Sequence, residues 1–315
     1  RVETERTLAA IDDDEIVAEP VHLQERTAHD VGYIGENWPA ITFGKTKAAQ
    51  RLYSFRMKLL SAALVGALLS APAALAQAPE GGLAAETERH RDELTLLAKV
   101  LNCAVPACPL VAEPSRLVAQ PHDRPKLEGP LDIASTASQT LVLEYLEGKP
   151  MTEVGWGRVS RAEIEQLLRF HPLEFRYLNR PGYIAAAAAA PIVHEIVTAL
   201  GDRRAARLTL LAGHDTNVAD LGGFFDLHWQ VPSYPADEVP PGSALGFELV
   251  STAGGDRYVR AFYRAQTMDQ LRNLEALGSD DALFRRYLPI PGCGDSVEVT
   301  ACRWNDFARI AAPRG

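Results

Sequence analysis

The pair with the clearest capacity for chemistry is His214-Asp215, which follows a short apolar run at residues 208–212. That run lies between a charged segment and a glycine, a pattern that predicts a buried strand. Ligands of α/β folds bind outside the carboxyl ends of strands. There His214 could bind an anion and Asp215 could give a proton to a leaving oxygen. A helix starting near Asn217 would add N–H groups that favour phosphate. The alternative for the dipeptide alone is a turn with a local hydrogen bond.

Length, composition and charge set the bounds on the class of protein. The 315 residues allow one large domain or two smaller ones, and 47% apolar residues with 23% charged ones are typical of a globular chain. The formal net charge of −9 argues against a nucleic-acid-binding surface. Because the whole molecule repels anions, a phosphate site would have to gather its own positive charge.

Residues 57–78, MKLLSAALVGALLSAPAALAQA, have the anatomy of a secretory signal peptide. One basic residue precedes an uncharged apolar run that closes on small residues, and this favours a signal peptide over a transmembrane or core helix. Met57 would then be the native start, the location periplasmic or secreted, and no stable membrane span would remain after cleavage. Residues 1–56 carry no motif and are expected to be an unassigned extension, either helical or disordered.

The four cysteines fall into two local pairs. Cys103 and Cys108 lie five residues apart, and Cys293 and Cys302 lie nine apart. In an exported protein such pairs close as disulfides, whereas the alternatives are free thiols or half of a metal site. No second Cys/His pair has zinc-like spacing, so the sequence predicts disulfides and neither a metal nor a cofactor.

Amphipathic helices and a hairpin fill the rest of the chain. Helices are expected over 80–102, 133–146, 160–179, 183–200, 268–277 and about 304–310, and strands over 245–251 and 258–265. Ser160 and Glu163 form a capping box, and Pro191 marks a kink or a new helix start. We expect His90 to be exposed on a helix, and His171 and His194 to be structural.

The string Gly213-His214-Asp215-Thr216-Asn217, followed by residues 221–223 (LGG) and Trp229, resembles the second catalytic motif of the histidine acid phosphatases. The similarity is to the bacterial periplasmic branch of 4-phytase and glucose-1-phosphatase, and it covers about residues 82–312. The resemblance implies an α/β histidine-phosphatase (phosphoglycerate-mutase-like) sheet with a helical subdomain, truncated at its N-terminal part, over residues 79–315. It also implies two local disulfides.

The resemblance further implies a small-molecule phosphomonoester as substrate: phytate, glucose-1-phosphate or another sugar phosphate. His214 would contact phosphate, Asp215 would be the general acid, and Thr216 and Asn217 would bind substrate. A helix within residues 133–146 would pack beside the site. The family often carries an acidic residue there, whereas this chain has Gln139, with Glu144 further along.

The family's nucleophile, a histidine in an Arg-His-Gly-x-Arg-x-Pro loop after the first strand, has no counterpart among the eight histidines. Arg89-His90-Arg91 is only superficially similar. About the first third of a mature enzyme is therefore expected to be missing, which would leave exposed sheet edges. The leading hypothesis is an acid phosphatase-type phosphomonoester hydrolase. The alternative is a catalytically inactive fragment or mis-joined gene product. A weaker third reading is a membrane-anchored interaction protein spanning the bilayer with residues 57–76.

Overall fold

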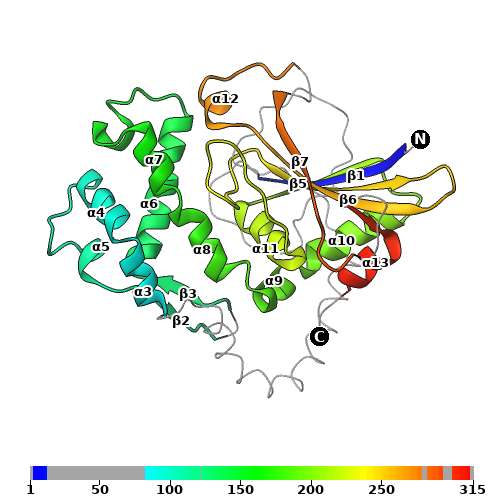
Figure 1. Cartoon of the computed structure of the whole chain (residues 1–315), viewed down its shortest axis with the longest axis horizontal. Coiled ribbons are helices and arrows are strands. Elements are labelled where there is room, and N and C mark those ends of the chain that lie inside the picture. Colours follow the sequence, from blue (N-terminus) through cyan, green and yellow to red (C-terminus); the bar gives the residue numbers. More distant parts are fainter. Residues whose placement is uncertain (1–2, 13–81, 122, 279–281, 294–299, 313–315) are drawn as a thin grey trace, which may run out of the picture. The chain divides into compact units, whose positions relative to one another are not determined.

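The structure is a computed structural model that describes residues 3–12, 82–121, 123–278, 282–293 and 300–312 (Figure 1). For residues 3–12 only the backbone is described. The expected signal peptide at 57–78, and with it the question of cleavage or membrane anchoring, lies outside the described residues.

A six-stranded sheet forms the centre of the α/β fold. Its order is β4 (Leu208–Gly213), β1 (Glu3–Asp12), β5 (Ala244–Ser251), β6 (Arg257–Ala265) and β7 (Phe284–Leu288), and the short β8 (Ala301–Arg303) also pairs with β6. β5 and β6 form the expected antiparallel hairpin. A separate two-stranded sheet joins β2 (Arg116–Val118) to β3 (Lys126–Glu128).

Strand β1 shows that residues 3–12 form a strand, whereas a helical or disordered segment was expected there; the rest of residues 1–56 lies outside the described residues. The strand runs parallel to β4 and antiparallel to β5, with Ile11 opposite both Ala212 and Ala244. In the sheet, β1 fills the position between β4 and β5, so those two strands are not edges toward each other, whereas the other side of β4 is an end of the described sheet order. Pairing along both edges satisfies backbone groups that a short polar segment could otherwise satisfy only with water.

Strand β4 is half-exposed, so the expectation of a fully buried strand was wrong. Its residues alternate between exposed and partly covered, and Leu208 and Leu210 keep 48% and 37% of their surface. The reason is topological: β4 stands at the end of the described sheet order, with β1 as its neighbour.

The helices lie near the expected segments with different bounds. They are α3 (Gly82–Arg89), α4 (Arg91–Val100), α5 (Pro109–Ala112), α6 (Pro130–Leu146), η3 (Val154–Gly157), α7 (Arg161–Leu167), α8 (Phe170–Leu178), α9 (Gly182–Ala188), α10 (Ala190–Gly201), α11 (Asp215–Phe225), α12 (Met268–Arg272) and α13 (Trp304–Ile310). Helix α6 begins earlier than expected, and the segments 160–179 and 183–200 each contain two helices. The Ser160–Glu163 capping box caps α7, and Pro191 lies in the first turn of α10, as expected. Helix α12 ends early, and Leu274 just beyond it has a positive φ of 50°.

The expected helix over 80–102 is also divided, with the break at His90. The imidazole is half-buried between α3 and α4 and makes an edge contact with Phe170, with ring centroids 5.4 Å apart. The expectation of an exposed helical His90 was therefore wrong. His194 is exposed on α10.

Aromatic packing fixes α11 against the sheet. Phe225 on α11 lies 5.1 Å from Phe247 on β5 and stacks 5.5 Å from Phe307 on α13, measured between ring centroids. All three rings are almost fully buried. Burying such rings stabilises the core by about 1.5–3 kcal/mol each, and the cluster holds the helix that carries the candidate site.

Both expected disulfides are present. Cys103 is bonded to Cys108 and Cys293 to Cys302. In the described part of the chain no single helix has the length and apolar character to cross a membrane; α9 and α10, bent by 63°, meet that test only as a pair.

Candidate functional site

The candidate site lies where β4 ends and α11 begins. His214 is extended and precedes the helix, and its backbone N–H donates to Asn217 Oδ1 at 2.9 Å. Asn217 therefore holds the turn itself. The His214 side chain is exposed, while Asp215 is the first residue of α11 and is partly covered. Two neighbouring residues thus present an accessible imidazole and a sheltered carboxylate at the end of a strand.

The glycines of the LGG string bring α11 close to the segment before α9. A Cβ added at Gly223 would lie 2.5 Å from Arg180 Cα, and one at Gly222 would lie 2.6 Å from Arg180 Nη1. At Gly223 the contact is with backbone, which leaves no room for a side chain, so this glycine allows the close approach of α11 to Arg180.

Three groups surround the carboxylate of Asp215. Gln139 Nε2 on α6 donates to Oδ2 at 3.2 Å, the Thr216 backbone N–H donates to Oδ1 at 2.6 Å, and His171 Nε2 on α8 lies 3.4 Å from Oδ2. The expectation that Gln139 lies beside the site is confirmed. Its amide donates where an acidic residue would repel Asp215.

His171 joins Asp215 to a second buried carboxylate. Its Nδ1 lies 2.7 Å from Glu238 Oε1, and the His171 and Glu238 side chains are 6% and 4% exposed. Burial acts against the charged imidazole, but Glu238 and Asp215 outweigh it and raise the pKa of His171 to about 10. His171 is therefore an imidazolium at neutral pH. It is buried, as a structural residue would be, but its contact with Asp215 was not expected.

The imidazolium decides the protonation of Asp215. Burial would raise the pKa of Asp215, but His171, the Thr216 N–H and the Gln139 amide outweigh it and lower the pKa. Asp215 is thus a carboxylate at neutral pH. To act as an acid it needs low pH or a bound anion whose negative charge opposes ionisation.

Glu174, three residues after His171 on α8, has the opposite shift. Burial raises its pKa, and the negative charges of Asp132 and Asp215 add to the effect. The site thus contains carboxyl groups with pKa values shifted in opposite directions, an arrangement that is enriched at functional sites. No local sequence pattern indicates Glu174 or Glu238 as members of the site.

The other predicted residues have local roles in the structure. The Thr216 carbonyl accepts a hydrogen bond from Asn179 Nδ2 at 3.4 Å. Glu144 Oε2 accepts the Gly155 N–H at 2.9 Å and so holds the turn at η3. Among the described residues no group of three or more His, Cys, Asp or Glu side chains is placed to hold a metal.

Sequence comparison finds curated relatives, although no family model matches the chain. Phytase AppA of Escherichia coli (strain K12) is 31% identical over 200 residues, which are 60% of this chain and 46% of that protein. Glucose-1-phosphatase of Providencia rettgeri is 27% identical over 213 residues, 65% of this chain and 50% of that protein. The chain therefore spans about half the length of the curated relatives it matches.

Solved phytase structures match the described fold. The Hafnia alvei phytase in complex with myo-inositol hexakis sulphate gives a TM-score of 0.68 at 28% identity, covering 76% of this chain and 63% of that one. The Citrobacter braakii phytase gives 0.69 at 29% identity, with 76% and 64% covered. The mixed α/β fold expected from the sequence is thus confirmed over part of these structures. Over this matched part the chain is similar to the histidine acid phosphatases of the phytase and glucose-1-phosphatase branch.

Proposed function

We propose that the chain carries the acid-catalytic half of a phosphomonoester hydrolase site, with Asp215 as the general acid. The observation that carries this proposal is the carboxylate at the start of α11, held by His171 and Gln139 beside the exposed imidazole of His214. The relatives named phytase and glucose-1-phosphatase support phytate and sugar phosphates as the substrate class.

The chemistry asked of Asp215 is one proton transfer. A phosphate bound near His214 and the N-terminus of α11 would add negative charge beside Asp215 and raise its pKa. The protonated carboxyl would then give its proton to the ester oxygen as the P–O bond breaks and a water oxygen bonds to phosphorus, so that the alcohol leaves neutral and the phosphoryl group becomes phosphate. Because the His171 imidazolium contacts Asp215, it would stabilise the carboxylate that remains on Asp215 after the proton has been transferred.

The alternative is that the chain binds phosphate without hydrolysing it. Strand β1 favours this alternative, because it lies beside β4 and pairs Asp12 with Gly213, next to His214. In the family the nucleophilic histidine follows the strand in such a position. Here an acidic segment, Asp12 to Glu15, stands at that place in the sequence. Without that histidine, the proton donor Asp215 would have no nucleophilic partner to attack phosphorus.

The deciding experiment is hydrolysis of p-nitrophenyl phosphate and phytate at acid pH by the chain and by Asp215→Asn. Hydrolysis that falls by about 10²-fold or more in the variant supports the general acid. Equal hydrolysis by both proteins contradicts it. If neither protein hydrolyses substrate, ³¹P NMR measures whether the chain binds phosphate. Binding supports the alternative of a phosphate-binding chain without hydrolysis, and no binding means that the chain has no phosphate site. In that assay the wild type binds phosphate and His214→Ala binds it more weakly.

Export is part of the same proposal. Two disulfides are consistent with an extracytoplasmic location. We infer a signal peptide at 57–78, an extension at 1–56 and a partial phosphatase domain at 79–315. Cleavage after residue 76 or 78 would separate β1 from the domain and leave β4 and β5 without the strand between them. N-terminal sequencing of the periplasmic protein decides between a start near Gln77, which supports the signal peptide, and a start that retains β1.

A further inference from the structure

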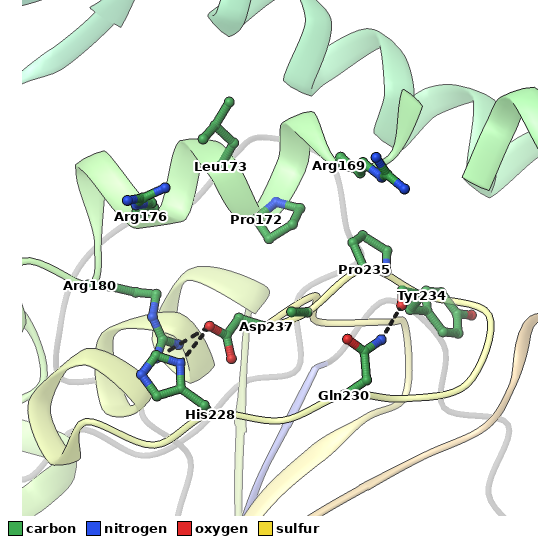
Figure 2. Close-up of a pocket in the computed structure, with 11 residues that line it drawn as sticks. Arg169, Pro172, Leu173, Arg176, Arg180, His228, Gln230, Tyr234, Pro235 and Asp237 are labelled. Atoms are coloured by element: carbon green, nitrogen blue, oxygen red, sulfur yellow. Dashed lines mark hydrogen bonds and ion pairs between the residues drawn. The ribbon is translucent and has the colours of Figure 1, made fainter. Parts of the chain in front are cut away.

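A cavity of about 630 Å³ lies against α8, away from the candidate site. Its lining comes from one face of α8 and from the loop at 228–237, and it includes neither His214 nor Asp215 (Figure 2). At about 100° of rotation per residue, the α8 positions that line it point roughly opposite to His171. The helix therefore separates two sites.

The charged side chains of this cavity are mostly positive. They are Arg169, Arg176, Arg180, His228 and Asp237. Among the arginines and the acid alone, three cations face one carboxylate, in a chain whose formal net charge is −9. Such a local excess runs against the charge of the whole molecule, and in a concave site it concentrates anions.

Arg180 is fixed at one side of the cavity. Its side chain is 10% exposed, and Nη2 donates to the Leu227 carbonyl at 2.6 Å and lies 3.8 Å from Asp237 Oδ2. Nη1 is buried and has no hydrogen-bond partner. Burial lowers the pKa of Arg180, and the negative charge of Asp237 raises it by less than burial lowers it. Asp237 therefore offsets only part of the cost of burying the guanidinium charge.

Asp237 has other partners. Its Oδ1 accepts the Trp229 N–H at 3.1 Å, and its Oδ2 lies 2.7 Å from His228 Nδ1 (Figure 2). These bonds fix the Asp237 carboxylate to its own loop, and no ion pair joins it to Arg169 or Arg176 among the described residues.

Arg169 and Arg176 remain available at the rim. Both are exposed, and within the described ranges neither side chain makes a hydrogen bond or an ion pair. They are seven residues apart on or next to α8, which places their backbones about 10 Å apart along the helix. Each guanidinium group can donate two parallel hydrogen bonds to one phosphate. Two such groups at that separation could therefore bind two phosphate groups of the same ligand.

We propose that this cavity binds a small anion carrying more than one phosphate group, held by Arg169 and Arg176 at the rim with Arg180 and His228 beside them. The excess of two positive charges favours a multiply charged ligand over a single carboxylate. The site is independent of the proposed phosphomonoester site, because its residues lie on the other face of α8.

The test is isothermal titration calorimetry with tripolyphosphate. The variant is Arg169→Gln/Arg176→Gln, which changes two exposed side chains without partners. The matched control is Arg203→Gln/Arg207→Gln, which removes the same charge at two exposed positions outside the cavity lining. We expect the wild type and the control to bind alike and the variant to bind about tenfold more weakly or worse. The NMR signals of the His228 imidazole should shift on binding in the wild type.

Two results would overturn the proposal. Equal binding by the wild type and the Arg169/Arg176 variant would place the anion elsewhere, including at His214. Equal weakening in both double variants would show a general charge effect without a site. Circular dichroism of the variant confirms that the fold is retained.

Discussion

Replacing His171 with glutamine tests whether a buried cation holds the two carboxylates of the candidate site. The substitution keeps a polar side chain of similar size but removes the positive charge between Glu238 and Asp215. The pKa of His171 rises from 6.5 to about 10 in the folded chain. At about 1.4 kcal/mol per pKa unit this corresponds to about 5 kcal/mol of favourable proton binding. Breaking a buried ion pair costs a similar amount, about 3–5 kcal/mol.

The pH dependence gives the sign of the effect. Because the folded pKa lies above the unfolded one, the stabilisation is fully present below pH 6.5 and is lost as the pH rises through about 10. His171→Gln should therefore lower the free energy of unfolding by several kcal/mol at pH 6.5 and by much less near pH 10. The pKa of Asp215 should rise in the variant, because its largest stabilising partner is gone.

Urea unfolding followed by tryptophan fluorescence measures the effect, and ¹³C NMR of the Asp215 carboxyl reports its pKa. His194→Gln is the matched control, since His194 is exposed on α10. The reasoning is refuted if the two variants have the same urea midpoint at pH 6.5, or if their difference does not shrink toward pH 10.

Two further changes probe the surroundings of the site. Burial raises the pKa of Asp220 to about 6 from 3.8, so the folded chain binds a proton more tightly and its stability should fall as the pH rises from about 4 to above 6. Asp220→Asn should remove up to about 3 kcal/mol of that fall. Thermal unfolding at pH 4 and at pH 7 measures it, and an equal change in stability between the two pH values in both proteins would contradict the prediction. Gly155→Ala should cost about 1–3 kcal/mol, because Gly155 has a φ of +54° and a new Cβ would lie 2.8 Å from a Val159 methyl. Gly254→Ala, where the nearest atom is 3.7 Å away, is its control, and equal midpoints in urea would refute the packing argument.

The sequence by itself determined the features that depend on neighbouring residues. An apolar run ending in a glycine predicted β4 and placed His214 and Asp215 at its end. Cysteines five and nine residues apart predicted both disulfides, and Ser160 with Glu163 predicted a helix start. Each of these is a short-range pattern, so the local spacing of residue types is sufficient to predict it.

Only the tertiary structure decided what surrounds the candidate site. Glu238 lies 67 residues from His171, and Gln139 lies 76 residues from Asp215, so no local pattern indicates these contacts. The charge of His171 follows from two carboxylates brought together by α8, α11 and a loop. The place of β1 in the sheet has the same origin: its two edges are satisfied by β4 and β5, strands about 200 residues away along the chain. Burial and charge at this site are properties of packed elements, which a sequence pattern specifies only after the fold has brought them together.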